Sequence, residues 1–445
     1  RLSENHMDHD AHLLRRYAEE NSEAAFAELV AQVAPVYDGI VKCFKEGGGV
    51  SYSEFPHFHA DMRELSAPIF EATLLEHRPA LHVQRAFLVA VGPVAREHGR
   101  VGPLRVEVVA HGEQQLATAD AEAALELEAE ALTLTRVELS LRHLVEDRLA
   151  GFERRAAGHP RYETVARIHG ASERMLRGKP AVEVADEIEA ALASGPPSDP
   201  YAFGMAIDLL VKTERDDAAA RWLDLAIEAA RAYGFGLRLA SLHTQRAIVE
   251  LGRGVVGNAE LDVQTALRLA GARHFMLPRI VGVAIQVALE RGEAEAAAKL
   301  VEDHGGDNLA RERVLVDEYL VSRGRLRIAT GDVRDGLADL LRCGEILHSY
   351  GIVRPTDWRS DAVGALAELG EEARAERLAR EGVAAARAFG APRALARSLR
   401  AAGRVIGGEE GLELLEEAVS IVEPSPARLE AAYPLADLGT ELIER

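Results

Sequence analysis

The sequence predicts an all-α protein made of helical hairpins that follow one another along the chain. Three observations predict this class. Ala, Leu, Arg and Glu, which are strong helix formers, dominate the 445 residues. Val and Ile rarely alternate with polar residues, so the sequence lacks the pattern of a large β-sheet. Glycine-containing turns recur at a nearly constant spacing, which is typical of repeat architectures.

The repeat is clearest in residues 323–390. There an apolar helix runs into a turn at Gly331 and an amphipathic helix follows, and the same arrangement recurs around Gly370, 39 residues later. Each hairpin has an apolar face that it cannot bury alone, so we expect neighbouring hairpins to stack.

Similar turns extend the pattern over residues 121–445. The turn markers, 36 to 40 residues apart, are Gly178, the glycine-free turn Glu214-Arg215-Asp216, Gly252, Gly292, Gly331, Gly370 and Gly407. Small residues that follow the markers would let paired helices approach closely: Ala219, Ala259, Ala296, Gly336, Ala375 and Gly411. A period of this length with two helices per unit predicts a tetratricopeptide-like α-solenoid with a divergent, longer unit.

Residues 1–120 are predicted to form a separate, mostly helical segment. Within it, residues 34–78 are similar to the connector that precedes the catalytic domain in some bacterial class I methyltransferases. Such enzymes next need a strand and a Gly-rich turn such as D-x-G-x-G to hold the cofactor, and no such turn follows here. A degenerate methyltransferase-like or metal-dependent enzyme, with its site in residues 34–120, is therefore the alternative to a non-enzymatic protein.

Charge and composition narrow the function. The formal net charge of −20 argues against direct nucleic-acid binding by this chain, which would need clustered Lys and Arg. Cys43 and Cys343 are expected to be free thiols in a reducing compartment. No run approaches 18 consecutive apolar residues, and the first residues lack the apolar core of a signal peptide. We therefore expect a cytoplasmic protein without membrane contact.

Three stretches carry a resemblance to a known family. They are LELEAEALTLTRVELSLRHLVEDRLAGFERRA (125–156), RGRLRIATGDVRDGLADLLRCGEIL (323–347) and ARAFGAPRALARSLRAAGRVIGGEEGLELLEEAVSIVEPSPARLEAAYPLADLG (386–439). From about residue 124 onward, the chain resembles the helical-repeat region of large ATP-binding LuxR-type transcriptional regulators. That resemblance implies a region that senses inducers or binds partner proteins. The family's G-x-x-x-x-G-K-[ST] loop and its helix-turn-helix are not found here, so neither ATP hydrolysis nor DNA binding is implied for this chain.

The inner face of a solenoid is the expected place for a ligand or a peptide. The candidates for lining such a groove are its uncommon residues: Trp222, Tyr233, His243, His274, Phe275, Tyr319, Tyr350 and Trp358. Each also has an alternative role in packing. Trp222 and Phe275 can fill hairpin cores, and Tyr233 and Tyr350 can pack at the C-terminal ends of helices.

We predict no catalytic residue, no cofactor and no metal site. His6, His9 and His12 cluster near the start of the sequence, and His57 and His59 lie close together. We interpret the first group as part of a flexible terminus and the second as a solvated loop, rather than as metal sites. Glu and Asp are expected on solvated helix faces or in pairs with Arg one helical turn away.

The sequence thus favours a non-enzymatic, tetratricopeptide-like module of a transcriptional regulator. It would sense a small-molecule inducer or bind a protein partner on its inner groove and respond by a shift between conformations. A self-associating scaffold is a further alternative, with residues 433–443 as the candidate surface of a homodimer.

Overall fold

The computed structural model describes residues 121–137, 139–197, 199–232, 236–270, 276–304, 306–310, 315–425 and 427–444. The chain divides into two compact units, Arg1–Glu128 and Ala129–Arg445. Nearly all of the described residues belong to the second unit.

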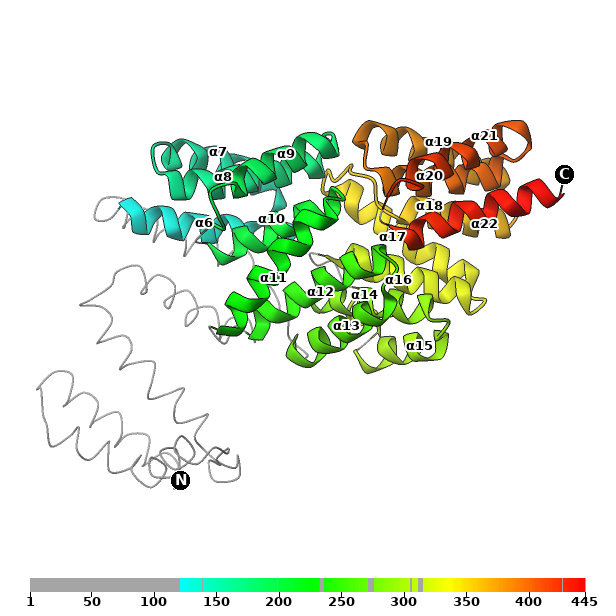
Figure 1. Cartoon of the computed structure of the whole chain (residues 1–445), viewed down its shortest axis with the longest axis horizontal. Coiled ribbons are helices and arrows are strands. Elements are labelled where there is room, and N and C mark those ends of the chain that lie inside the picture. Colours follow the sequence, from blue (N-terminus) through cyan, green and yellow to red (C-terminus); the bar gives the residue numbers. More distant parts are fainter. Residues whose placement is uncertain are drawn as a thin grey trace, which may run out of the picture. The chain divides into compact units, whose positions relative to one another are not determined.

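All regular structure in these residues is helical, which confirms the predicted all-α class (Figure 1). The elements are α6 (Ala121–Val137), η2 (Leu139–Leu144), α7 (Val145–Ala156), α8 (Pro160–Leu176), α9 (Ala181–Leu192), α10 (Pro200–Lys212), α11 (Asp216–Ala232), α12 (Gly236–Gly252), α13 (Val256–Ala270), α14 (Leu277–Glu290), α15 (Ala294–Asp303), η3 (Gly306–Asn308), α16 (Val316–Ala329), α17 (Val333–Ser349), α18 (Trp358–Glu368), α19 (Glu372–Phe389), α20 (Pro392–Ile406), α21 (Gly408–Val422) and α22 (Arg428–Glu444). The short η2 and η3 are 3₁₀-helices.

From α8 to α21, consecutive helices pair into hairpins, and the predicted tetratricopeptide-like solenoid is confirmed. The first helix of each hairpin is followed by one residue with a φ between +63° and +94°: Gly178, Glu214, Gly254, Gly292, Gly331, Gly370 and Gly407. These residues are 36 to 40 positions apart, which matches the predicted period. The left-handed conformation ends the helix and turns the chain back on itself.

Two positions in the predicted pattern were wrong. Gly252 is the last residue of α12, and Gly254 makes the turn and donates its N–H to the carbonyl of Leu251. Ala296 is exposed, whereas the fully buried Ala297 takes the place of the small residue against α14. Ala297 follows Gly292 by five residues, so its offset from the turn equals that of Ala259 from Gly254.

Glycines set the closest approaches between paired helices. A Cβ atom added to Gly336 of α17 would lie 2.7 Å from the carbonyl oxygen of Gly324 in α16. A Cβ atom on Gly411 of α21 would lie 2.5 Å from the carbonyl oxygen of Gly403 in α20. In both hairpins the obstacle is backbone, which cannot rotate away. The two helices therefore touch along their main chains, as the small residues in the sequence predicted.

Replacing Gly336 by Ala is expected to lower the free energy of unfolding by about 1–3 kcal/mol, because the new methyl group would push α17 off α16. Gly364→Ala is the matched control, since Gly364 also lies inside a helix but has open space around it. That control should stabilise the protein by about 0.5–1 kcal/mol. Urea denaturation of both variants checks the prediction, and equal effects would contradict it.

Residues far apart in sequence also meet within this unit. The loop between α17 and α18 (350–357) reaches α8, where the carbonyl of Leu176 accepts hydrogen bonds from the N–H groups of Val353 (2.8 Å) and Arg354 (3.3 Å). Near the other end, α22 packs against α12, and the hydroxyl of Tyr433 donates to the carboxylate of Glu290. Hairpins that are not neighbours in the repeat are thus joined directly.

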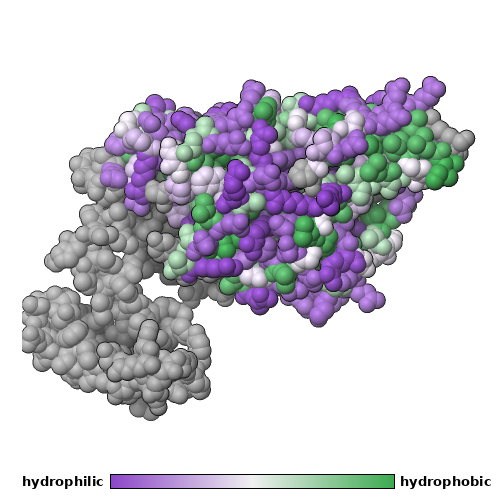
Figure 2. Space-filling view, viewed as in Figure 1, coloured by the Kyte–Doolittle hydropathy of each residue, from purple (hydrophilic) through white to green (hydrophobic). Residues whose placement is uncertain are grey.

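The surface seen in Figure 2 is largely hydrophilic, with a hydrophobic area at the end formed by α22. The large hydrophobic residues exposed on α22 are Leu435, Leu442 and Ile443. Among the described helices, none combines the length and the apolar character that crossing a membrane requires.

Candidate functional site

The predicted groove residues that the structure describes have different surroundings in the repeat. Tyr319 is fully buried, and its hydroxyl donates to the carbonyl of Gly306 (3.0 Å). His243 is also buried, with its Nδ1 2.7 Å from a carboxylate oxygen of Asp262. Neither side chain lines an open surface. Tyr233, His274 and Phe275 lie outside the described residues.

The two tryptophans are half-buried and pack within the repeat. The ring of Trp222 meets the ring of Phe203 edge to face, with centroids 5.7 Å apart. Trp358 lies against α17, where a Cβ atom on Gly344 would come within 2.5 Å of its ring. Gly344 therefore makes room for this tryptophan. Tyr350, another of the predicted groove residues, lines a cleft beside α8.

Other predictions fall outside the described residues: Cys43, the histidine clusters near residues 6–12 and 57–59, and an enzyme site in residues 34–120. Within the described part of the chain, no group of three His, Cys, Asp or Glu side chains is placed to hold a metal ion. Cys343 is a free and buried thiol.

A group of charged side chains is buried where the first helices of several hairpins meet. We call it the inner ion cluster: Asp208 and Lys212 of α10, Arg279 of α14, Asp317 and Glu318 of α16, and Arg354 of the α17–α18 loop. Arg279 Nη2 lies 2.6 Å from Asp208 and its Nε 3.5 Å from Glu318. Arg354 contacts Asp317 at 2.9 Å. The expectation that acidic residues would sit on solvated faces or pair one turn away is wrong here, because neighbouring helices supply buried partners.

Glu318 makes the contribution of the inner ion cluster to folding stability depend on pH. Burial raises the pKa of Glu318, and the neighbouring Asp317 carboxylate raises it further, to about 7, against the opposing influence of Arg279. The folded chain therefore holds this proton more tightly than the unfolded chain, in which the pKa is near 4.5. Stability from this group is complete below pH 4.5 and is lost as the pH rises through 7.

Glu318→Gln is accordingly expected to reduce the loss of stability between pH 4.5 and pH 7 by up to about 3 kcal/mol. Urea denaturation at several pH values in this window, on the wild type and the variant, measures the difference in slope. Glu302→Gln, at an exposed position, should leave the slope unchanged. Parallel curves for wild type and Glu318→Gln would contradict the assigned proton.

A second set of ion pairs continues from the inner ion cluster toward the C-terminal helices. Arg325 of α16 contacts Asp357 (3.0 Å) and Asp361 (2.7 Å). Arg397 of α20 contacts both Asp357 and Glu430 of α22. The loop that holds Arg354 and Asp357 is thus tied by charge to α16 on one side and to α20 on the other.

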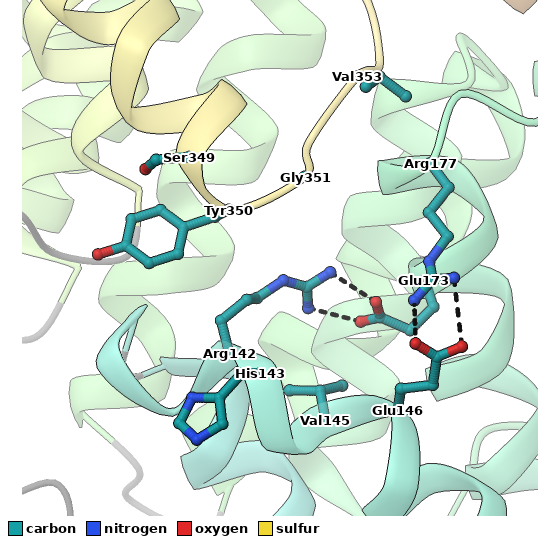
Figure 3. Close-up of a pocket in the computed structure, with 10 residues that line it drawn as sticks. All are labelled: Arg142, His143, Val145, Glu146, Glu173, Arg177, Ser349, Tyr350, Gly351 and Val353. Atoms are coloured by element: carbon teal, nitrogen blue, oxygen red, sulfur yellow. Dashed lines mark hydrogen bonds and ion pairs between the residues drawn. The ribbon is translucent and has the colours of Figure 1, made fainter.

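A cleft of about 590 Å³ opens between this loop and the helices that precede it (Figure 3). Its lining comes from η2 and α7 (Arg142, His143, Val145 and Glu146), from α8 (Glu173) and the residue after it (Arg177), and from the end of α17 and its loop (Ser349, Tyr350, Gly351 and Val353). The left-handed conformation of Gly351 ends α17 and sends the chain toward α8. The hydrogen bonds to Leu176 then fix the loop as a wall of the cleft.

Two ion pairs join η2 and α7 to α8 and the residue after it, on the side of the cleft opposite the loop, as Figure 3 shows. On the buried side, Glu173 accepts two hydrogen bonds from Arg142 (2.7 and 2.5 Å), and Arg136 also contacts it at 2.7 Å. On the exposed side, Arg177 donates to both carboxylate oxygens of Glu146 (3.3 and 2.7 Å). The pKa of Arg136 is lowered to about 10, mainly by burial. The negative charge of Glu173 opposes this shift, and the positive charge of Arg142 adds to it. Arg136 therefore stays charged at neutral pH.

Comparison with known proteins adds little to this geometry. No protein-family model and no curated protein matches the sequence. A Rap protein in complex with competence and sporulation factor is a similar solved structure, with 10% identity over 72% of this chain and 98% of that chain and a TM-score of 0.47. A STAND protein with a tetratricopeptide repeat sensor from Pyrococcus horikoshii has 13% identity over 73% of this chain and 55% of that chain, with a TM-score of 0.35. The APC/C hetero-tetramer Cut9–Hcn1 has 11% identity over 77% of each chain, with a TM-score of 0.30. The chain thus spans about half the length of the STAND protein (55%). Similarities this remote carry no information about ligand or partner.

The lining of the cleft combines paired charged groups with side chains of the loop. On its buried side Arg136 and Arg142 both pair with Glu173, and the loop contributes Tyr350 and the exposed side chain of Val353 to the lining. A volume of this size is in the range of pockets that hold small molecules. Sequence reasoning found Tyr350 but missed the charged residues, because nothing in the repeat period indicates which distant hairpins meet.

Proposed function

We propose that residues 121–445 are the helical-repeat module of a LuxR-type transcriptional regulator, and that the module senses a small-molecule inducer or binds a protein partner without catalysing a reaction. The cleft between η2, α7, α8 and the α17–α18 loop is the proposed site. The observation that carries this proposal is the position of the loop, which is both a wall of the cleft and a member of two ion-pair groups. The resemblance of residues 323–347 and 386–439 to that family supports the regulatory role.

The loop connects the cleft with the rest of the repeat. Tyr350 and Val353 face the cleft, Arg354 pairs with Asp317 of α16, and Asp357 pairs with Arg397 of α20. A molecule that moves the loop must also move or break these pairs. Occupancy of the cleft would therefore bias the packing of α16 against α18 and α20, which is what a sensor requires.

Site-specific photo-crosslinking in the native host tests the proposed site. A photoreactive phenylalanine at position 350 is expected to form a specific adduct, identified by mass spectrometry as a small molecule or a peptide. The matched control carries the same residue at Leu261 of α13, which is 64% exposed on another part of the repeat. Absence of an adduct at position 350, or the same adducts at both positions, would overturn the proposal.

Self-association is a second candidate, because Leu435, Leu442 and Ile443 leave α22 with an exposed apolar surface. A homodimer through α22 would cover these side chains. Light scattering over a range of concentrations tests it directly. The wild type should form a dimer that Leu442→Glu with Ile443→Glu abolishes, and a wild type that stays monomeric at high concentration would remove this candidate.

A further inference from the structure

We propose that α22 pairs with α22 of a second copy of this chain, in antiparallel orientation and with the two Gly439 residues in contact beside a two-fold axis. This inference rests on the self-association proposed above as the second candidate, because it names the surfaces that meet. Three features carry it: an apolar outer face of α22, a glycine with open space in the middle of that face, and the use of the same sequence motif in the hairpin of α16 and α17.

The outer face of α22 is apolar. Leu435, Leu442 and Ile443 are 54%, 55% and 85% exposed. Gly439 lies four positions after Leu435 and four before Ile443, so these residues share one side of the helix. A Cβ atom on Gly439 would have nothing within 4 Å. Figure 2 shows the resulting hydrophobic area at this end of the repeat, and exposed apolar groups of this kind mark interaction surfaces.

The opposite side of α22 fixes how the helix is oriented. Glu430 contacts Arg397, and Asp437 contacts Arg400, both of α20. Residues 430 and 437 are about two helical turns apart and lie on the side of α22 opposite to Gly439. The ion pairs therefore hold the charged side of α22 against α20 and direct the apolar side away from it. Because the outermost helices of a solenoid normally carry a polar outer face, this apolar side is expected to have a partner.

The hairpin of α16 and α17 shows how such a face is covered. A Cβ atom on Gly324 would lie 3.0 Å from the carbonyl oxygen of Gly336 and 3.0 Å from the side chain of Leu340. A Cβ atom on Gly336 would lie 2.7 Å from the side chain of Ile328. Each glycine is thus covered by the aliphatic residue four positions after the glycine of the other helix. The motif Gly-x-x-x-aliphatic therefore pairs with itself when two helices run in opposite directions.

α22 carries the same motif. Residues 439–443 read GTELI, with isoleucine four positions after glycine, as in α16. A two-fold axis beside Gly439 makes two copies of α22 antiparallel and brings each face against an identical one. Ile443 of each copy then covers Gly439 of the other, as Ile328 covers Gly336. Leu435 lies opposite Leu442 of the other copy, so the three exposed apolar side chains leave water.

The dimer is expected to be reversible, because one helix from each copy makes a small interface. Each chain carries a formal net charge of −20, so two copies repel one another at low ionic strength. Salt screens this repulsion and does not weaken an apolar contact. We therefore expect sedimentation equilibrium to show a dissociation constant that decreases as the salt concentration rises. A dimer held by ion pairs would show the opposite trend, which would contradict the proposed pairing.

Gly439→Ala separates this pairing from other modes of association. The monomer has room for the methyl group, so its melting temperature at low protein concentration should not fall. In the dimer, two methyl groups beside the axis would hold the backbones apart, and association should weaken at least about tenfold. Gly364→Ala is the matched control, because Gly364 is also a helical glycine with open space but lies in α18. The control should leave the dissociation constant unchanged.

Cross-linking tests the direction and the register of the two helices. Chains with Leu435→Cys are mixed with chains with Leu442→Cys, both in a Cys43→Ser background, and the remaining Cys343 is buried. Oxidation should link the mixture, because position 435 lies opposite position 442 of the other copy. Neither variant should link on its own. Equal positions are separated by about 9 Å or more along the antiparallel helix axes, which is too far for a disulfide.

A dimer that Gly439→Ala weakens, and that cross-links only in the mixture of the two cysteine variants, supports the proposal. A dimer that Gly439→Ala leaves unchanged, or in which Leu435→Cys links on its own, would overturn this pairing and leave self-association through another arrangement. A wild type that stays monomeric at high concentration and high salt would overturn both. The sensing function is decided separately, by the adduct at position 350.

Discussion

Replacing Arg279 by Met is expected to lower the free energy of unfolding by about 3–5 kcal/mol, because it removes one partner of a buried ion pair. Arg279 is 2% exposed and has Asp208 and Glu318 as partners. Without the guanidinium, the carboxylate of Asp208 would stay buried with Lys212 as its remaining cation. Backbone contact between α14 and α16 prevents relief by movement, because a Cβ atom on Gly282 would lie 2.7 Å from the carbonyl oxygen of Glu318.

Urea denaturation measures this loss. Lys299→Met is the control, because Lys299 is 73% exposed and pairs with Asp303 of its own helix; its effect should stay below about 1 kcal/mol. Adding Asp208→Asn, Lys212→Met and Glu318→Gln to Arg279→Met should recover much of the lost stability, since Lys212 also pairs with Asp208 and Glu318 and no charge of these four residues then remains buried without a partner. A loss below about 1 kcal/mol for Arg279→Met alone would contradict the cluster.

Replacing Arg393 by Leu is expected to cost about 3–5 kcal/mol, because it would release two buried carboxylates 177 and 179 residues earlier in the chain. Arg393 of α20 pairs with Asp216 at the start of α11 and with Glu214 in the turn before it. The carboxylate of Glu214 also accepts the N–H groups of Arg393 (2.7 Å) and Ala394 (3.1 Å). Glu214 thus caps α20, whose own N-cap residue, Ala391, provides no side-chain hydrogen bond.

This contact explains why one hairpin turn lacks glycine. Glu214 has a φ of 63°, a conformation that is unfavourable for residues with a side chain by about 1 kcal/mol, and the other turns use glycine there. If the turn alone mattered, Glu214→Gly would stabilise the protein by that amount. We expect instead a loss of about 1 kcal/mol, because the cap of α20 and the partner of Arg393 disappear together.

A double-mutant cycle between Glu214→Gly and Arg393→Leu, followed by urea denaturation, measures the coupling between the two residues. A coupling energy of about 1 kcal/mol or more is expected. Hydrogen exchange of the amides of residues 393 and 394 should accelerate in Glu214→Gly. If Glu214→Gly were more stable than the wild type and the hydrogen exchange in α20 were unchanged, the contact between Glu214 and α20 would not contribute to stability.

Much of the fold could be predicted because each unit of a repeat is specified by residues that are close together in the sequence. The turns after the first helices recur at a nearly constant spacing, and apolar residues three to four positions apart give each helix the face that packs against its neighbour. The errors were small shifts of the same kind, Gly252 for Gly254 and Ala296 for Ala297. They arose because adjacent small residues fit the pattern almost equally well.

The candidate site could not be predicted in the same way. Its walls come from residues near 145, 175 and 351. The period of the repeat does not indicate which hairpins contact each other when they are several units apart in the sequence. Aromatic residues were candidates either for a groove or for core packing, and Tyr319 lies in the core beside the fully buried Leu320. The sequence showed that Glu214 stands in a turn where the other hairpins have glycine. It did not show that Arg393 of α20 is the partner of Glu214.

Hydrogen exchange of the protein, with and without the molecule captured at position 350, shows whether the cleft is the binding site and whether the loop responds to its occupant. We expect slower exchange in the α17–α18 loop and at the end of α8, with a change at the start of α20 through Asp357 and Arg397. Peptides from α13, away from the cleft, should not change. Protection confined to α13 and its neighbours, with the loop unaffected, would contradict the assignment of the cleft as the binding site.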